Sequence, residues 1–433
     1  MPSPRLLVLS NGHGEDLIAL RVLEALARRR PELTLQVLPL VGEGQAFAAA
    51  EATGLLQRLG PRRSLPSGGF SNQSLSGLRR DLAAGLAGLS LQQWRWVRRW
   101  GQGGERGSTA VLAVGDLLPL LLAWGSGAPF AFLGTPKSDY TWATPGPAGW
   151  PASPLADGYH RCKGSEWDPW EWRLMASRRC RLVAMRDGLT ARGLQRKGIA
   201  ALAPGNPMLD GLEQAALPGW LARRRRLLLL PGSRLPEALQ NAHRLLEALG
   251  DGPAAAPEAT TVLVACGARP TALEWDGLLQ RLHWQPATLA VEAAAAGAVA
   301  CWRRGALQLL LGPGCFSRWA GWAEVGLATA GTATEQLVGL GVPALSLPGP
   351  GPQFKAGFAR RQCRLLGGAV QPCHNGAELQ RRLLRLLQDP ERRQALGAIG
   401  RRRMGAAGGS DALAALLETR LLSPSGPANQ RLG

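Results

Sequence analysis

Lysine is scarce in this sequence. Only four of the fifty basic residues are lysines, and the remainder are arginines. This bias is typical of a genome's codon usage, but the net charge of +19 that it produces acts as a physical field. Such a field favours anionic partners, which include nucleotides, phospholipid surfaces and nucleic acid.

Cysteine is sparse and scattered, with seven residues and no Cys-x-x-Cys pair. The five histidines do not stand beside acids at metal-ligand spacing. These patterns argue against a zinc site and against a secreted disulfide scaffold. We therefore expect no metal ion, and reduced thiols in a cytoplasmic protein.

No long uninterrupted apolar run is present. The N-terminal run RLLVLS (5–10) is too short for the apolar core of a signal peptide. The longest apolar window, 116–134, is broken by Asp116, Pro119 and three glycines, so that a helix followed by a strand explains it better than a membrane span. We expect a soluble or at most peripheral protein.

Two common nucleotide motifs are also missing. The segment GHGEDL (12–17) lacks the third glycine of the dinucleotide fingerprint, and Lys137-Ser138 follows a proline instead of the glycine of a P-loop. NAD binding and P-loop hydrolysis therefore lose their main support, and no cofactor is expected.

The chain does contain two similar openings. RLLVLS (5–10) precedes a glycine-containing polar turn and an amphipathic helical stretch, and RLLLLP (226–231) does the same in the second half. Both predict a strand, a turn and a helix, the first unit of a nucleotide-binding fold. Further strands without polar alternation indicate parallel sheets covered on both faces. With 433 residues, we expect an N-terminal domain over 1–215, a C-terminal domain over 216–422 and a disordered tail over 423–433.

The hexapeptide GTATEQ (331–336) lies between two strand-like runs. Thr332 and Glu335 have the spacing of a helix capping box, which is a purely structural interpretation. In parallel sheets, however, ligands bind beyond the carboxyl ends of the strands, where glycines let the backbone approach a pyrophosphate. The two interpretations are compatible. The predicted phosphate and ribose site comprises Gly232, Ser233, Arg234, Gly331, Thr332 and Glu335.

With these residues placed, the chain resembles glycosyltransferases of the GT-B fold, and more narrowly lipid-A-disaccharide synthase and its relatives. The matching pieces follow one another along most of the chain: AVGDLLP (113–119), PGNPMLDGL (204–212), LLLLPGSRLPE (227–237) and the stretch 331–367. The last piece also resembles the donor site of the peptidoglycan N-acetylglucosaminyltransferase. Two departures are Asn206, where the synthases usually have histidine, and the first loop SNGHGED.

The resemblance implies an α/β protein with two Rossmann-like domains whose parallel sheets face each other across a cleft. It also implies a UDP-sugar in the C-terminal domain, with Glu335 on the ribose, Gly232, Ser233 and Arg234 near the phosphates, and Gln353 reaching the sugar. No metal is implied, because helix dipoles and side chains neutralise the leaving diphosphate in this fold.

Transfer to a hydroxyl requires a general base, for which the N-terminal half offers two candidates. Asp116 follows the strand-like run AVLAVG (110–115), and His13 lies in the first turn. Their structural alternatives are a helix N-cap for Asp116 and a solvated turn residue for His13. We favour Asp116, because the resemblance also points to it.

Two segments have two equally supported interpretations. The irregular, aromatic stretch 137–172 suits either an acceptor-binding lid or a packed surface excursion. The stretch 78–100 places leucines at helical spacing and then Trp94, Trp96 and Trp100 among arginines. That pattern suits a membrane interface or a core-facing helix with a solvated basic face. Aromatics among arginines also stack on bases, but no nucleic acid is expected.

The sequence therefore predicts a metal-independent enzyme that moves a hexose from a UDP-sugar to a lipid-linked or glycolipid acceptor. We expect it in the cytoplasm, peripheral on the inner face of the membrane and on an anionic surface. One alternative is a non-hydrolysing UDP-sugar epimerase, which shares the fold. The other is a non-catalytic basic protein that binds RNA or membranes.

Overall fold

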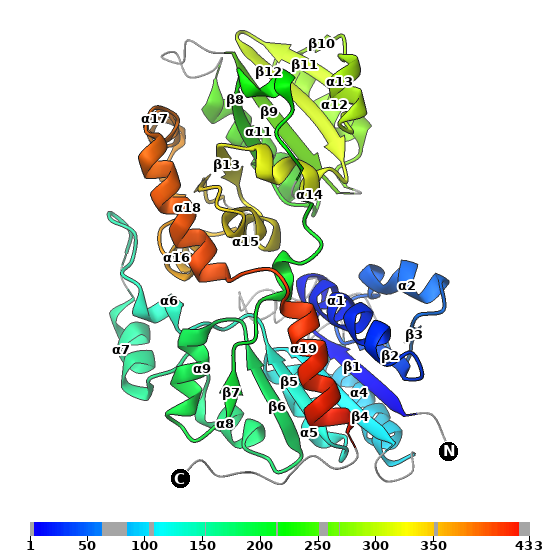
Figure 1. Ribbon diagram of the computed structural model, residues 1–433. Coiled ribbons are helices and arrows are strands. Elements are labelled where there is room, and N and C mark those ends of the chain that lie inside the picture. Colours follow the sequence, from blue (N-terminus) through cyan, green and yellow to red (C-terminus); the bar gives the residue numbers. More distant parts are fainter. Residues whose placement is uncertain are drawn as a thin grey trace. The chain divides into compact units, whose positions relative to one another are not determined.

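The computed structural model describes eight segments of the chain: residues 4–62, 85–103, 108–151, 153–213, 215–250, 259–267, 269–349 and 354–423. Gln353 and residues 424–433 of the expected tail lie outside these segments. The chain divides into two compact units, here called the N-terminal and the C-terminal domain (Figure 1). The first comprises Met1–Ala143, Ser153–Asp210 and Ala406–Gly433, and the second comprises Thr144–Ala152 and Gly211–Gly405.

The N-terminal domain is built on a parallel sheet of seven described strands, in the order β3-β2-β1-β4-β5-β6-β7. The strands β1 and β4 lie at its centre, and every residue of β4 is buried. The strand bounds are β1 Arg5–Ser10, β2 Thr34–Pro39, β3 Gln57–Arg58, β4 Thr109–Gly115, β5 Phe130–Gly134, β6 Cys180–Met185 and β7 Ala201–Leu202.

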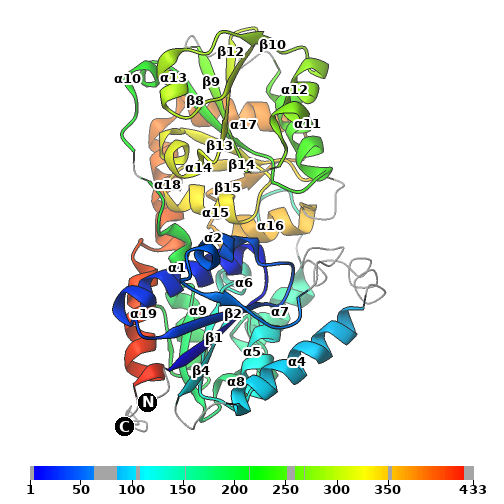
Figure 2. The same cartoon turned by 90° about the vertical axis from the view of Figure 1, so that its right-hand side faces the viewer.

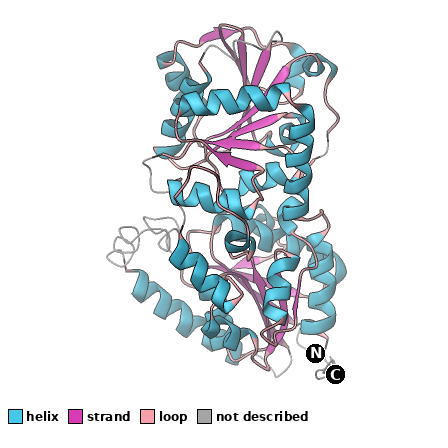
Figure 3. Cartoon of the chain, turned by 90° about the vertical axis from the view of Figure 1, so that its left-hand side faces the viewer, coloured by secondary structure: helices cyan, strands magenta, loops and turns pink. Residues whose placement is uncertain are grey.

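Helices cover both faces of this sheet, which explains why its central strands are mostly apolar (Figure 3). The buried residues of the central strands and of the covering helices form the core of the domain. The α-helices are α1 His13–Arg29, α2 Ala48–Ala52, α4 Leu86–Gln102, α5 Leu117–Gly125, α6 Tyr140–Ala143, α7 Pro154–Lys163, α8 Pro169–Met175, α9 Gly188–Gln195 and α19 Gly409–Leu417.

The C-terminal domain has a second sheet, in the order β10-β11-β12-β9-β8-β13-β14-β15. Only the pairs β10–β11 and β11–β12 are antiparallel, and the other neighbours are parallel. The strand bounds are β8 Arg225–Leu230, β9 Thr260–Cys266, β10 Gln285–Ala287, β11 Ala300–Arg304, β12 Leu307–Pro313, β13 Val325–Ala328, β14 Ala344–Ser346 and β15 Val370–Pro372.

The helices of this domain enclose a second apolar core around β8, β9 and β13. The most amphipathic of them bury leucines on one side, as their sequence periodicity predicts. Their bounds are α10 Gly219–Ala222, α11 Glu237–Leu249, α12 Ala272–Arg281, α13 Val291–Ala295, α14 Phe316–Trp319, α15 Thr332–Gly339, α16 Ala356–Leu365, α17 Gly376–Gln388 and α18 Pro390–Met404.

Each sheet reverses its strand order beside its first strand. In the N-terminal domain β1 lies between β2 and β4, and in the C-terminal domain β8 lies between β9 and β13. Such reversals are the topological switch points at which parallel α/β sheets bind ligands. The predicted fold of two Rossmann-like domains with parallel sheets is confirmed.

The domain composition differs from a simple division at residue 215. The chain from Ala406 returns to the N-terminal domain, where α19 lies beside α1, and Thr144–Ala152 belongs to the C-terminal domain. Arg28 and Asp411 form an ion pair of 3.0 Å between α1 and α19. Local sequence periodicity carries no information about which distant helix α19 contacts.

Among the described residues, no helix combines the length and the apolar character needed to cross a bilayer.

Candidate functional site

The predicted donor residues follow two neighbouring strands of the C-terminal sheet. Leu230 at the end of β8 and Ala328 at the end of β13 are register partners, so the turns after them begin side by side. The Thr329 hydroxyl donates a hydrogen bond of 3.1 Å to the carbonyl oxygen of Pro231 and joins the two turns directly. The structure therefore brings Gly232–Arg234 and Gly331–Glu335 to one switch point.

The helix after β13 does not form the predicted capping box. The helix α15 begins at Thr332 with Gly331 as its N-cap, and a glycine has no side chain that could cap the helix. Thr332 is thus the first helical residue, one position too late to cap, and Glu335 lies in the first turn, partly exposed. The structural interpretation of the Thr-x-x-Glu spacing is wrong, whereas the ligand-binding interpretation stays a prediction.

Arg234 and its neighbours have the exposure that a phosphate site needs. Gly232 has a φ of +100°, in the region that favours glycine, and Ser233 is exposed. Arg234 is partly buried, and burial lowers the pKa of its guanidinium, which stays protonated because its ordinary value is so high.

A supporting set of side chains holds the surrounding turns. Asn241 donates to the Pro231 carbonyl oxygen at 3.2 Å, and Arg244 donates to the carbonyl oxygens of Leu347 and Pro348 at 3.3 and 2.6 Å. The amide of Gln362 donates to the carbonyl oxygen of Ala330, just before α15. These bonds fix the backbone of the turns after β8, β13 and β14. Asn241, Arg244 and Gln362 thus support the turns that carry the predicted ligand residues.

The first candidate base, Asp116, directly follows β4 at the switch point of the N-terminal sheet. Its Oδ1 accepts hydrogen bonds from the side chain of Asn11 (3.0 Å) and from the backbone N–H of Leu118 (3.2 Å). Asp116 is therefore the N-cap of α5, as its structural alternative predicted. Burial raises the pKa of its carboxyl, and the Leu118 N–H and the Lys137 ammonium oppose this effect.

Two further carboxyls, Glu15 and Asp16, which belong to no candidate site in the sequence, lie in the first turn of α1. Burial raises the pKa of Glu15 to about 7, and the charges of Asp116 and Asp16 add to this effect. Burial likewise raises the pKa of Asp16 to about 6, although its Oδ1 accepts a 2.5 Å hydrogen bond from Ser10. The other candidate base, His13, is the first residue of the same helix.

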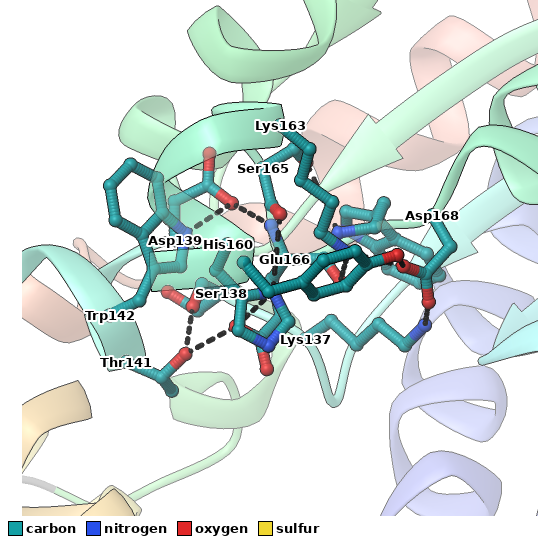
Figure 4. A network of polar contacts seen from close by, with 12 residues as sticks. Lys137, Ser138, Asp139, Thr141, Trp142, His160, Lys163, Ser165, Glu166 and Asp168 are labelled. Atoms are coloured by element: carbon teal, nitrogen blue, oxygen red, sulfur yellow. Dashed lines mark hydrogen bonds and ion pairs between the residues drawn. The ribbon is translucent and has the colours of Figure 1, made fainter. Parts of the chain in front are cut away.

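Lys137 connects this edge to a larger polar network that Figure 4 shows. Its ammonium donates to both carboxylate oxygens of Glu171, at 2.7 and 2.6 Å, and lies 3.8 Å from Asp168. Asp168 and Glu171 form the capping box of α8, with Asp168 also paired to Lys163. The site thus has a positive charge near Asp116 that structural carboxylates hold in place.

The same network fixes much of the irregular stretch 137–172. Asp139 is buried and accepts a 2.6 Å hydrogen bond from the N–H of Glu166, whose carboxylate accepts from the Thr141 hydroxyl at 2.8 Å (Figure 4). Trp167 is fully buried. Within the C-terminal domain, Trp150 stacks on His374 with ring centroids 4.4 Å apart. These contacts describe a packed excursion; whether any part of it binds an acceptor stays a prediction.

The tryptophans of α4 pack against the core of the N-terminal domain, to which α4 belongs. Trp94, Trp96 and Trp100 contact its apolar core, and the Trp100 indole donates a 2.7 Å hydrogen bond to Gln36. A Cβ added at Gly125 would lie 2.3 Å from the Trp94 ring. The indoles thus lie on the core-facing side of α4. Arg95, Arg98 and Arg99 are exposed on its outer side.

Known structures resemble the whole chain, although no family model and no curated protein matches its sequence. A proposed UDP-N-acetylglucosamine 2-epimerase from Listeria monocytogenes is 12% identical, covers 100% of both chains and has a TM-score of 0.57. The calicheamicin glycosyltransferase is 14% identical over 96% of this chain and 99% of its own, with a TM-score of 0.56. MurG from Acinetobacter baumannii is 15% identical over the same shares, with a TM-score of 0.51.

These likenesses define the class of the fold. The chain has the GT-B fold, and its structural neighbours include glycosyltransferases and UDP-N-acetylglucosamine 2-epimerases. Sequence identities this low establish a shared fold only, so the chemistry has to be inferred from the residues of the site. The narrower resemblance to lipid-A-disaccharide synthase rests on the sequence pieces.

Proposed function

We propose that this protein is a glycosyltransferase that moves a hexose from a UDP-sugar to a hydroxyl of a lipid-linked or glycolipid acceptor, as lipid-A-disaccharide synthase does. One observation carries the proposal: the glycine-containing turns after β8 and β13 start at register partners and are bonded to each other. An arginine, a serine and a helix N-terminus thus meet at the switch point of one sheet.

In this proposal the C-terminal domain binds the donor. Arg234, Ser233 and the backbone at Gly232 contact the diphosphate, with Gly331 and Thr332 at the start of α15. Glu335 accepts hydrogen bonds from the ribose hydroxyls, and Gln353 reaches the sugar. Arg234 and the amides of α15 offset the charge that develops on the leaving UDP, so the reaction is proposed to need no metal.

The N-terminal domain is proposed to supply the proton acceptor at the carboxyl edge of its sheet. Asp116 and His13 are the candidates that the sequence names. The hydroxyl of the acceptor substrate loses its proton as its oxygen bonds to the anomeric carbon of the sugar.

We further propose that the enzyme works in the cytoplasm, on the anionic inner face of a membrane, and that α4 provides the contact. Its exposed side carries Arg95, Arg98 and Arg99, and Leu91 is 49% exposed. These residues line a hollow of about 310 Å³ together with Trp94 and Gln102. Figure 2 shows α4 beside α5, which adds Leu121 and Trp124, 36% and 38% exposed. Basic side chains around apolar ones suit a bilayer surface.

The direct test is the substitution Glu335→Ala. Because α15 starts without the predicted capping box, we expect the variant to lose at least tenfold in UDP affinity by calorimetry while its melting temperature stays within about 2 °C of the wild type. Glu292→Ala is the matched control, since Glu292 is also an acid in the first turn of a helix of the same domain. Unchanged UDP affinity in Glu335→Ala would remove Glu335 from the donor site.

A second experiment identifies the reaction. Purified protein is incubated with UDP-hexoses and a lipid extract of its own host, and mass spectrometry follows the products. A glycolipid one hexose heavier than its precursor is the expected result. Conversion of the UDP-sugar to its C2 epimer without transfer would identify an epimerase instead. RNA binding without UDP binding would identify the non-catalytic alternative.

A further inference from the structure

Three turns of the N-terminal sheet bring their polar side chains together at its switch point. Glu15 comes from the first turn of α1, Asp116 from the end of β4, and Thr135 from the end of β5. The Thr135 hydroxyl donates to Glu15 Oε1 at 3.3 Å, and Asn11 donates to Asp116 at 3.0 Å. A Cβ added at Gly115 would lie 3.7 Å from Cγ of Glu15, which places this side chain against the end of β4.

We propose that Glu15 takes the proton of the acceptor hydroxyl and that Asp116 is a positioning residue, whose charge tunes Glu15. This assignment rests on the proposed function and refines it, because the sequence motifs name Asp116 and His13 for that role.

The hydrogen bonds separate the roles of the two carboxyls. Asp116 Oδ1 accepts two N–H bonds and holds the start of α5, and such bonds stabilise a carboxylate and make it a weaker base. Glu15 accepts a hydrogen bond from its own backbone N–H and one from the Thr135 hydroxyl, whose 3.3 Å length is beyond the usual O–H···O range. Glu15 can therefore exchange this contact for a substrate hydroxyl without uncapping a helix.

Exposure distinguishes Glu15 from the third acid of the cluster. Asp16 is 2% exposed and bonded to the buried Ser10 beneath it, so a substrate has no path to its carboxyl. Glu15 is only partly buried and lies one residue nearer the start of α1. Of the two acids of this helix turn, Glu15 is the more exposed residue.

The charges around Glu15 suit a base that works near neutral pH. On α1 its neighbour is Asp16, from β4 it faces Asp116, and the loop after β5 contributes the uncharged Thr135 and the ammonium of Lys137, which acts on Asp116. Burial and the two carboxylates raise the pKa of Glu15 to about 7. A general base is most effective when its pKa lies close to the working pH.

The step balances without any further reactant. The acceptor O–H proton passes to the Glu15 carboxylate as the hydroxyl oxygen forms its bond to the anomeric carbon. The bond from that carbon to the diphosphate oxygen breaks, and its electron pair leaves with UDP. Glu15 then returns the proton to solvent.

The test measures the pH profile of transfer, with the UDP-hexose and host lipid extract described above, for three variants. Glu15→Gln should lower kcat by about 10²–10⁴-fold, the usual loss for a missing general base. Asp116→Asn keeps an N-cap residue on α5 but removes the charge. It should lower kcat by less than Glu15→Gln does and move the acidic limb of the profile to lower pH, because the pKa of Glu15 falls. Glu32→Gln, which changes an acid just after α1, should alter neither rate nor profile.

The outcomes separate this inference from the proposed function. Absence of transfer by the wild type would overturn the proposed function, and the role of Glu15 with it. Transfer by the wild type and by Glu15→Gln at comparable rates would overturn the assignment of Glu15 alone. If Asp116→Asn loses transfer, and the pH profile of Glu15→Gln keeps the acidic limb of the wild type, Asp116 is the base.

Discussion

At the scale of single residues, the donor turns show how a charged side chain is placed by its strand. Arg234 is four residues beyond Leu230, the last paired residue of β8, and is partly buried. Its predicted partner is the diphosphate, which a guanidinium binds with two parallel hydrogen bonds. We therefore expect Arg234→Ala to weaken UDP at least tenfold and uridine hardly at all, as measured by calorimetry.

Arg281→Ala is the control for charge alone, because Arg281 is an exposed arginine near the end of α12 in the same domain. It should leave both affinities unchanged. Equal losses for UDP and uridine in Arg234→Ala would show that Arg234 supports the structure of the turn and does not bind phosphate.

Glu15 makes a prediction about stability that needs no substrate. Its pKa in the fold is about 7, above the ordinary 4.5, so between these values the folded chain binds a proton that the unfolded chain does not. Stability therefore falls as the pH rises through this window. Glutamine does not titrate, so Glu15→Gln should be more stable than the wild type at pH 8, by about 3 kcal/mol, and nearly equal to it at pH 4.

Urea unfolding at the two pH values measures this difference. A Glu15→Gln variant that is equally stable or less stable than the wild type at pH 8 would show that the carboxyl is not held at an unfavourable charge. Functional carboxyls of this kind reduce stability in exchange for reactivity.

At the scale of elements, α19 shows which contacts hold the returning chain to the N-terminal domain. Leu413 is 2% exposed, whereas the ion pair that joins Asp411 of the same helix to Arg28 of α1 has side chains that are 69% and 64% exposed. Removing a buried leucine side chain leaves a cavity, while an exposed ion pair contributes little.

We therefore expect Leu413→Ala to lower the free energy of unfolding by about 2–4 kcal/mol. Asp411→Ala should lower it by less than about 1 kcal/mol. Thermal unfolding of the two variants and the wild type measures both differences in the free energy of unfolding. Comparable losses would mean that charge, and not apolar burial, docks α19.

The two sides of α4 have different environments. Its tryptophans lie against the core, and its arginines lie outside. A substitution of the tryptophans would therefore test packing rather than membrane binding. The residues proposed to contact a bilayer are the exposed arginines and the neighbouring Leu91, Leu121 and Trp124.

At the scale of the whole molecule, the net charge of +19 attracts the protein to any anionic surface. The proposed contact through α4 therefore has to be distinguished from the effect of the total charge. We expect reversible, salt-sensitive binding to vesicles that contain phosphatidylglycerol, since each arginine near such a surface contributes about 1 kcal/mol. Replacing Arg95, Arg98 and Arg99 with alanine should abolish flotation in a variant that remains folded.

The matched control replaces three exposed arginines of the C-terminal domain, Arg381, Arg385 and Arg392, with alanine. This variant has the same net charge and should still float. Equal loss of flotation in the two triple variants would show that total charge decides membrane binding and that α4 is not a specific contact.

Local sequence patterns determined the elements and the residues at their ends. Apolar runs without polar alternation specify buried parallel strands, and glycine-containing turns before amphipathic stretches specify the start of a βα unit. These signals lie within about ten residues of one another, so no distant contact is needed to read them. This is why both Rossmann-like openings and the turns around Arg234 and Glu335 could be placed in advance.

The tertiary structure alone decided which of these elements are neighbours. Pro231 and Thr329 are 98 residues apart in the chain and are joined by a hydrogen bond, because β8 and β13 pair at a switch point. Glu15 likewise meets Thr135 across 120 residues. Strand order, the direction of the α4 indoles and the return of α19 depend on packing between distant segments, and short-range periodicity does not encode that packing.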